Sequence, residues 1–257
     1  MMPRVVPYLS EEAIERDAAA LLAEYSQKRR VAITPPIPIE DIVEKHLKLR
    51  IEFDDMHARQ NVPRPANGET MILGAIYGDG SIFIDESLDP EDYPSKEGRY
   101  RFTVAHEGGG HWRLHQSLII QDSAQFSFLD GNSEPNFICR LNEAKKREEW
   151  QADFYASCLL MPRKFVMAAW DEMFPDRKRR VLQPRVPIDH PFVEVPRIEC
   201  RIGDYDCSED DDSLLDRIAR PLAGRFLVSA IAMRIRLEKL GLLLREVPHQ
   251  RLLTSGA

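Results

Sequence analysis

The stretch AHEGGGHWRLH, residues 105–115, decides how the rest of the sequence is interpreted. His106 and Glu107 begin the pattern H-E-x-x-H, in which two histidines four positions apart on one helix bind a single metal ion. Here the next histidine, His111, comes five positions after the first. In a regular α-helix five residues turn by about 500°, which leaves the two side chains roughly 140° apart instead of roughly 40°. A regular helix therefore cannot direct both imidazoles to one ion.

Three arrangements are compatible with the extra residue. In the first, a π-bulge with i to i+5 hydrogen bonds absorbs it and returns His106 and His111 to one face, as such bulges often do at functional sites. In the second, the helix breaks at the glycines 108–110, so that His106 and Glu107 end one segment and His111 begins the next. In the third, His111 and His115 bind the metal at regular spacing, which leaves no glutamate beside the first ligand and an impaired or inactive site.

A second helix-forming stretch, REEWQADFYASCLLMP at residues 147–162, supplies carboxylates. Catalytic zinc takes three protein ligands from imidazole and carboxylate and keeps one position open. We expect Glu149 to be the third ligand, because Ala152 and Ala156 would let this helix approach the histidines closely. Asp153, one turn later, is placed to accept a hydrogen bond from the other ring nitrogen of a ligand histidine.

Three blocks of the sequence together resemble the ImmA/IrrE family of bacterial and phage metallopeptidases. They are RFTVAHEGGGHWRLH at 101–115, EEWQADFYASCLLMP at 148–162 and LAGRFLVSAIAMRIRLEKLGL at 222–242. The resemblance extends from about residue 35 to residue 242. It implies an α+β fold, with a zincin-like metallopeptidase domain of a small mixed sheet and active-site helices, followed by a helical, helix-turn-helix-like segment.

The resemblance also implies a function and a set of roles. The ligands of a Zn²⁺ ion would be His106, His111 and Glu149, with Glu107 as the catalytic general base. The substrate would be a helix-turn-helix transcriptional repressor, whose cleavage relieves repression of stress, phage or mobile-element, or defence genes. The alternative is a relative whose catalysis is impaired by the inserted glycine. Such a protein would act as a regulator that binds the repressor or DNA without cutting.

The elements before the motif are predicted from pattern. Ser10 is the expected N-cap of a helix, and PIEDIVEKHL at 38–47 is expected to form a second, short helix. Alternating apolar residues at 49, 51 and 53 predict a half-buried strand, and ILGAIYGDGSIFID at 72–85 predicts a hairpin around Gly78-Asp79-Gly80. An edge strand of this hairpin, SIFID at 81–85, is the expected binding place for an extended peptide.

The second half of the chain is expected to alternate helices with long loops. A helix from Ser95 to His115 is followed by a loop of roughly 25 residues and then by a helix at 143–162. We assign residues 1–174 to the metallopeptidase domain, 175–212 to a Pro-rich and acidic linker or loop, and 213–257 to a C-terminal helical segment.

The four cysteines form no C-x-x-C pair, which is typical of a reduced, intracellular protein. Cys139 falls in the expected loop between the two ligand helices, where a thiolate could bind the open metal position and regulate the site. The alternative for Cys139 is a partly buried free thiol. Cys158 lies among apolar residues of a helix and is expected in the core.

Charge and hydropathy limit the possible partners. The net charge of −7 gives no general attraction for nucleic acid or anionic membranes, and no apolar run approaches the ~20 residues of a membrane helix, so we expect a cytoplasmic protein. RFLVS at 225–229 resembles the turn of a helix-turn-helix, and the helix after it carries the cations Arg234, Arg236 and Lys239. These could read DNA directly, or the helix could pack onto the peptidase or the repressor through Ile231, Ile235 and Leu237.

Overall fold

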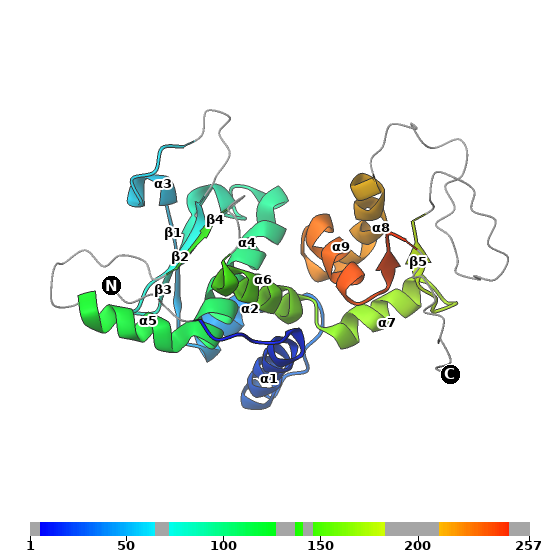
Figure 1. Cartoon of the computed structure of the whole chain (residues 1–257), viewed down its shortest axis with the longest axis horizontal. Coiled ribbons are helices and arrows are strands. Elements are labelled where there is room, and N and C mark those ends of the chain that lie inside the picture. The colour runs from blue at the N-terminus through cyan, green and yellow to red at the C-terminus, as the bar shows by residue number, and fades with distance from the viewer. Residues whose placement is uncertain (1–5, 65–71, 127–136, 141–145, 183–210, 247–257) are drawn as a thin grey trace, which may run out of the picture.

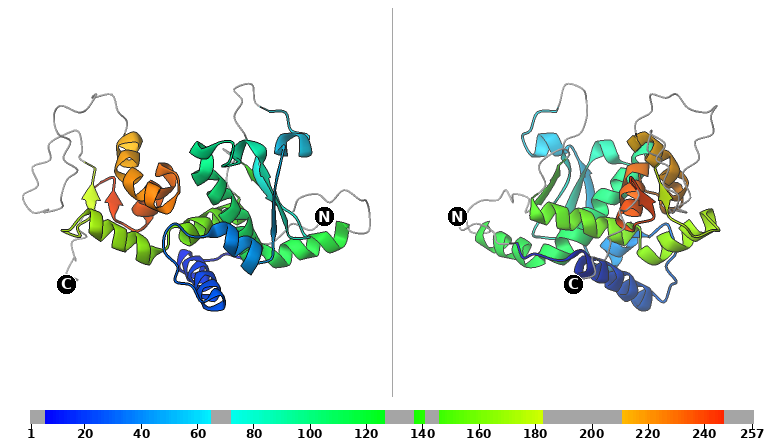
Figure 2. Two further views of the ribbon diagram at one scale, coloured as in Figure 1. Left: turned by 180° about the vertical axis from the view of Figure 1, so that it is seen from behind. Right: turned by 45° about the vertical axis from the view of Figure 1, so that its right-hand side comes forward.

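The computed structural model describes residues 6–64, 72–126, 137–140, 146–182 and 211–246 and has a mixed α+β architecture (Figures 1 and 2). Helices cover one face of a small sheet, and a second group of helices lies at the other end of the molecule (Figure 1). Within the described residues, none of the helices is both long and apolar enough to cross a membrane.

The first helix, α1 (Glu11–Arg29), confirms the prediction from Ser10. The Ser10 hydroxyl accepts a hydrogen bond from the backbone N–H of Ala13 at 3.2 Å, so it caps the helix. The helix ends at Arg30, which has a φ of 58°. One stripe of α1 is buried in the main core: Ile14, Ala18, Leu21, Leu22 and Tyr25.

The expected short helix is present as α2 (Ile39–Asp41) continued by the π-helical turn η1 (Ile42–His46). The chain then enters strand β1 (Arg50–Asp54) and the short helix α3 (Met56–Arg59), which Asp55 caps. The expected alternation is only partly realised, because Phe53 is 39% exposed and stacks on Tyr100.

The four strands of the main sheet have the order β1-β3-β2-β4. Strands β2 (Ile72–Ile76) and β3 (Ser81–Asp85) form the predicted antiparallel hairpin, in which Gly80 adopts a φ of 83° that favours glycine. Strand β4 (Phe137–Arg140) pairs with β2. Strand β1 pairs with β3 in parallel, from Arg50 opposite Ser81 to Asp54 opposite Asp85. The prediction that SIFID is an edge strand was therefore wrong, because β1 covers that side of β3.

The chain then forms one long helical run. Two short 3-10 turns, η2 (Glu86–Leu88) and η3 (Pro94–Lys96), precede α4 (Glu97–Val104), the π-helix η4 (Ala105–His111) and α5 (Trp112–Phe126). The prediction that the helix ends at His115 was wrong, since α5 extends eleven positions further, to Phe126. Apolar side chains continue at helical spacing beyond His115, and Leu118 and Ile119 pack into the core.

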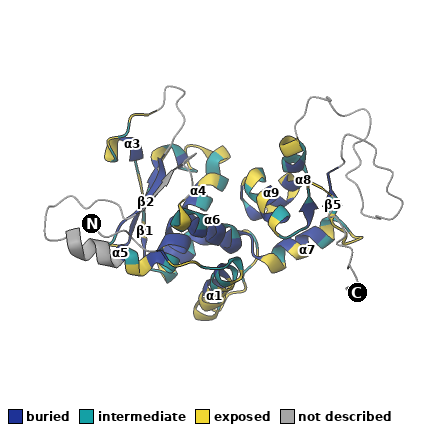
Figure 3. Ribbon diagram, in the orientation of Figure 1, coloured by how far each residue is buried: buried dark blue, intermediate teal, exposed yellow. Residues whose placement is uncertain are grey.

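Helix α6 (Arg147–Leu160) lies between α1 and the π-helix η4 and contacts both (Figure 1). Its face toward the core is made of small and aromatic side chains, among which Ala152, Tyr155 and Ala156 are fully buried. The central helices are accordingly buried along their inner faces (Figure 3). This packing brings residues about 40 positions apart in the sequence to one place.

The remaining elements gather at the other end of the molecule (Figure 1): α7 (Arg163–Met173), β5 (Arg180–Val181), α8 (Asp211–Phe226), α9 (Ala230–Lys239) and β6 (Leu243–Leu244). Helices α8 and α9 pack on each other, and the Ser229 hydroxyl caps α9. Strand β5 pairs in parallel with β6, so residues just after α7 join this group. Most of the stretch expected to be a linker, residues 183–210, lies outside the described residues.

Candidate metal site

The motif adopts the π-helical arrangement, the first of the three alternatives. The backbone N–H of Trp112 bonds to the carbonyl of Glu107, five positions earlier, at the end of η4. The wider turn brings the imidazoles of His106 and His111 to one side, with ring centroids 4.7 Å apart. The extra glycine therefore does not separate the two histidines.

Each of the three glycines lies against another part of the structure. A Cβ on Gly110 would lie 2.6 Å from the Cα of Ala152, and one on Gly108 would lie 2.7 Å from a methyl group of Val43. A Cβ on Gly109 would lie 2.9 Å from a leucine methyl group of α6. All three distances are shorter than an ordinary van der Waals contact. The glycines thus allow η4 to touch η1 and α6 closely, which a bulkier sequence would prevent.

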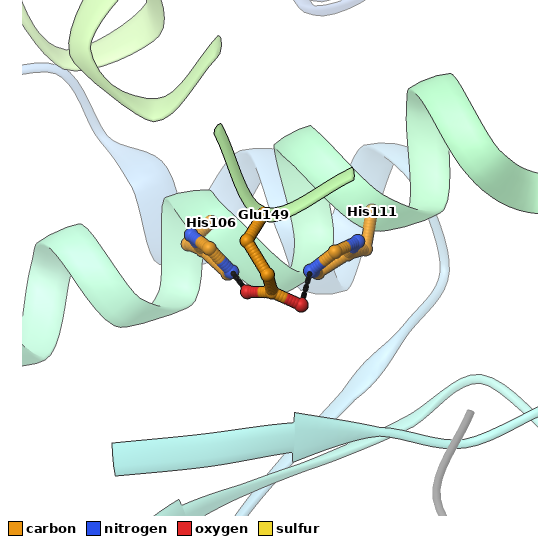
Figure 4. A group of neighbouring side chains, drawn as sticks. All are labelled: His106, His111 and Glu149. Atoms are coloured by element: carbon orange, nitrogen blue, oxygen red, sulfur yellow. Dashed lines mark ion pairs between the residues drawn. The ribbon is translucent and has the colours of Figure 1, made fainter. Parts of the chain in front are cut away.

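Glu149 reaches this pair of histidines from the first turn of α6 (Figure 4). Its Oε2 lies 3.2 Å from Nε2 of His106, and its Oε1 lies 3.5 Å from Nε2 of His111. One ligand atom from each of the three residues lies within 4.8 Å of the others. The group His106, His111 and Glu149 can hold a metal ion.

The hydrogen bond to Asp153 determines which way His106 presents its lone pair. Nδ1 of His106 lies 2.9 Å from Oδ1 of Asp153, and because a carboxylate only accepts, Nδ1 carries the hydrogen. In the neutral ring Nε2 then has a lone pair directed toward Glu149. This Nε2 is buried and makes no hydrogen bond within the described part of the chain. Two electron-rich atoms 3.2 Å apart fit a cation between them.

The buried position of His111 favours the form of the ring that binds a metal. Burial lowers the pKa of His111 to about 3, so its ring is neutral at pH 7. A neutral imidazole offers the lone pair that a divalent metal requires.

The third alternative, a His111 and His115 pair, is contradicted by the geometry. The two rings face each other through their Nδ1 atoms, 3.1 Å apart, so His115 lies behind His111. Nε2 of His115 points instead to Oε1 of Gln151 at 2.8 Å. The sequence reasoning missed Gln151, which is fully buried in α6. Its position two residues after Glu149 on a helix gave no signal of this contact.

Glu107 and Cys139 are the other two residues predicted to act at the site. Glu107 is fully buried beside His106 in η4, and its role as general base remains a prediction. Cys139 was expected in a loop but lies on β4, where its backbone is opposite Gly74. The prediction of a loop was wrong because residues 137–140 complete the sheet. The side chain of Cys139 lies outside the described residues, whereas Cys158 is buried as expected, which raises its pKa to about 11.

The basic residues of α9 pair with carboxylates of the same chain. Nε of Arg234 lies 2.5 Å from Oδ1 of Asp216, and Nζ of Lys239 lies 2.6 Å from Oε1 of Glu11. Arg236 is only 1% exposed and binds Glu15. These contacts direct the three cations inward or along the surface of the chain.

The apolar residues of α9 divide into two groups. Leu237 is buried in the core, as expected for a helix packed on the rest of the chain. Ile231 and Ile235, one turn apart, are 54% and 47% exposed. Leu237 thus packs α9 onto the rest of the chain, whereas Ile231 and Ile235 do not, and packing of these two side chains onto a repressor remains a prediction.

Comparison with known proteins adds no assignment to this geometry. No protein-family model matches the chain, and no curated protein matches it.

Proposed function

We propose that this protein is a zinc-dependent endopeptidase with a zincin-like fold, of the type found in the ImmA/IrrE family. The observation that carries the proposal is the convergence of His106, His111 and Glu149 across η4 and α6. Two imidazoles and one carboxylate are a common donor set of catalytic zinc in peptidases. A set of three leaves a fourth position for water and substrate.

The residues divide the chemistry between them. Zinc held by His106, His111 and Glu149 would polarise the scissile carbonyl and lower the pKa of a bound water towards ~7. Glu107 would act as the general base, accepting a proton from water and later passing it to the nitrogen of the leaving amine. Asp153 keeps the hydrogen on Nδ1 of His106, so that Nε2 stays available as a ligand atom.

An extended peptide would bind along β4. This strand is the last in the order β1-β3-β2-β4, and it contacts the π-helix that carries the histidines. Strand addition satisfies the backbone of a substrate and aligns its carbonyls with the site. Residues 137–140 would therefore hold the peptide in place of SIFID, which is an interior strand.

The proposed substrate is a helix-turn-helix transcriptional repressor. This part of the proposal depends on the resemblance of the three sequence blocks to the ImmA/IrrE family. Cleavage of such a repressor would release stress, phage or mobile-element, or defence genes, and it would take place in the cytoplasm. Zinc content and proteolysis can be tested before the repressor is identified.

The alternative functions are a catalytically impaired repressor-binding protein and a DNA-binding regulator. The reason to expect impairment is the extra glycine, and the short distance between the rings of His106 and His111 argues against that reason. The reason to expect DNA reading was the basic face of α9. The ion pairs of Arg234 and Arg236 with carboxylates of their own chain favour the peptidase.

Metal analysis and proteolysis test the proposal in two steps. The purified protein should contain about one zinc per chain, and Glu149→Ala should lose it whereas Glu148→Ala should keep it. The native protein should then cleave the repressor encoded beside its own gene, or sites within a library of extended peptides, and Glu107→Gln should not. If both proteins bind the repressor and neither cuts, the repressor-binding alternative is correct. A DNA gel shift abolished by Arg234→Ala would instead support the DNA-binding alternative.

A further inference from the structure

A line of polar contacts leads away from the proposed ligand His111 through the core. Nδ1 of His111 lies 3.1 Å from Nδ1 of His115, and Nε2 of His115 lies 2.8 Å from Oε1 of Gln151. Nε2 of Gln151 donates to the carbonyl of Pro7 at 2.8 Å. The three side chains are at most 1% exposed. The line therefore connects the metal site to the N-terminal segment through groups shielded from water.

The outer end of the line fixes the direction of every hydrogen bond in it. A backbone carbonyl can only accept, so the amide of Gln151 must turn its NH₂ group toward Pro7 and its oxygen toward His115. An amide oxygen also only accepts, so Nε2 of His115 carries a hydrogen. In the neutral ring of His115, Nδ1 is then an acceptor. The facing Nδ1 of His111 must supply the hydrogen between the two rings.

The result for His111 is that its Nε2 has a lone pair. This atom is the one that faces Oε1 of Glu149 at 3.5 Å. The other histidine reaches the same state by a different route, because Asp153 takes the hydrogen from Nδ1 of His106. Both rings therefore present Nε2 lone pairs to one point. The reverse direction of the line would place a hydrogen on Nε2 of His111 and block a metal there.

The carbonyl at the end of the line is itself held in place by α6. The guanidinium of Arg147 donates to the carbonyl of Val6 at 3.0 Å, next to Pro7. Arg147 and Gln151 are one helical turn apart on α6, so they hold two successive carbonyls of the N-terminal segment. Glu149 lies between them in sequence, on the same helix. One helix thus supplies the third metal ligand and the anchor of the line.

We propose that His115 and Gln151 are positioning residues that hold His111 in its Nδ1–H tautomer, with the carbonyl of Pro7 as the fixed end. The inference rests on the proposed metal site but not on peptidase activity. Outer hydrogen-bond partners of ligand histidines usually contribute 10- to 100-fold to metal affinity. The role of Asp153 toward His106 is the same in kind.

The tautomer can be observed directly in the metal-free protein. Long-range ¹H–¹⁵N correlations of ¹⁵N-histidine-labelled full-length protein, treated with a chelator, distinguish protonated from unprotonated ring nitrogens. The signals of His111 are assigned by their loss in His111→Asn. Native protein should show His111 with hydrogen on Nδ1, and Gln151→Met should shift it toward the Nε2–H form. A native His111 with hydrogen on Nε2 would overturn the inference whatever the protein's activity.

Zinc affinity, measured by competition with a chromogenic chelator, provides the second readout. His115→Leu removes the acceptor for His111 and should weaken zinc binding 10- to 100-fold. His115→Asn can place an amide oxygen near the position of Nδ1 and should bind within about threefold of native, again on the scale of these outer contacts. Equal losses in both variants, in proportion to their loss of thermal stability, would show a packing role only and overturn the inference.

The two proposals fail in different ways. Native protein that binds zinc but shows no change of His111 tautomer in Gln151→Met would overturn the positioning role and leave the peptidase proposal intact. Native protein with the Nδ1–H tautomer that binds no zinc would retain the hydrogen-bond line and overturn the metal site.

Discussion

His106 and His111 are five positions apart in the sequence, yet their imidazole centroids lie 4.7 Å apart. The separation is short because the residues between them form a π-helix, in which five positions complete about one turn. The three glycines before His111, one of which is the extra residue, also lie against η1 and α6. The π-helix that accommodates the extra residue is thus also the segment that packs closely against η1 and α6.

Substituting Gly110 tests that arrangement. In Gly110→Ala the new methyl group would lie 2.6 Å from Cα of Ala152, which is backbone and cannot rotate away. Helix α6 must move, and we expect a loss of about 1–3 kcal/mol in the free energy of unfolding. Zinc affinity should fall as well, because Glu149 is on the displaced helix. Chemical denaturation and chelator competition measure the two effects.

Gly224→Ala is the matched control for that substitution. Gly224 lies inside α8, and a Cβ there would meet nothing within 4 Å. Alanine should therefore stabilise the protein by about 0.5–1 kcal/mol through helix propensity. If Gly110→Ala behaves like Gly224→Ala, the close contact between η4 and α6 is not present in the protein.

Asp153 should act through His106. Asp153→Ala removes the acceptor for Nδ1 of His106 and should lower zinc affinity by 10- to 100-fold, whereas Asp153→Asn retains an oxygen and should lose less. Isothermal titration with zinc measures both. Unchanged affinity in Asp153→Ala would mean that this carboxylate does not orient the ligand.

Zinc should stabilise the folded chain, since the ligands come together only in the native state. At a free zinc concentration 100 times the dissociation constant, linkage predicts about 2.7 kcal/mol of added stability. A chelator should therefore lower the melting temperature of the native protein but leave that of Glu149→Ala unchanged. Equal shifts in the two proteins would place the zinc elsewhere.

How far the sequence predicts this structure depends on the range of the interactions. The cap at Ser10 and the hairpin around Gly80 follow from neighbouring residues, and both are confirmed. The place of SIFID in the sheet does not follow from neighbouring residues, because its partner β1 lies about 30 positions earlier in the sequence. Local pattern identified the hairpin but not its neighbour in the sheet.

The same limit applies to the site. Motif spacing predicts the histidines, and the second helix with its small alanines predicts Glu149. The π-helix is one of three open alternatives, because its choice depends on contacts with Val43 and Ala152. The hydrogen-bond line through Gln151 had no signal in the sequence. It joins α6 to the carbonyl of Pro7, about 140 positions away.

The ion pairs of Glu15 give the protein a predictable response to acid. Partial burial opposes ionisation of this side chain, but contacts with Arg163 and Arg236 keep the pKa of Glu15 below its usual value of 4.5. Its stabilisation, about 1 kcal/mol, is therefore complete above pH 4.5 and is lost as the pH falls through the lowered pKa. Glu15→Gln should be less stable than native at pH 7, and the difference should shrink in acid.

Unfolding by urea at several pH values, with chelator present, measures this difference. Glu44→Gln is a control on a neighbouring part of the fold, and its stability should follow that of the native protein at each pH. A constant difference between native and Glu15→Gln down to pH 3 would contradict the assigned ion pairs.

Anomalous diffraction at the zinc edge, from crystals of the zinc-loaded protein, tests the central claim most directly. We expect a single strong peak in contact with Nε2 of His106, Nε2 of His111 and a carboxylate oxygen of Glu149. A peak held by His111 and His115, or no peak near these residues, would contradict the account.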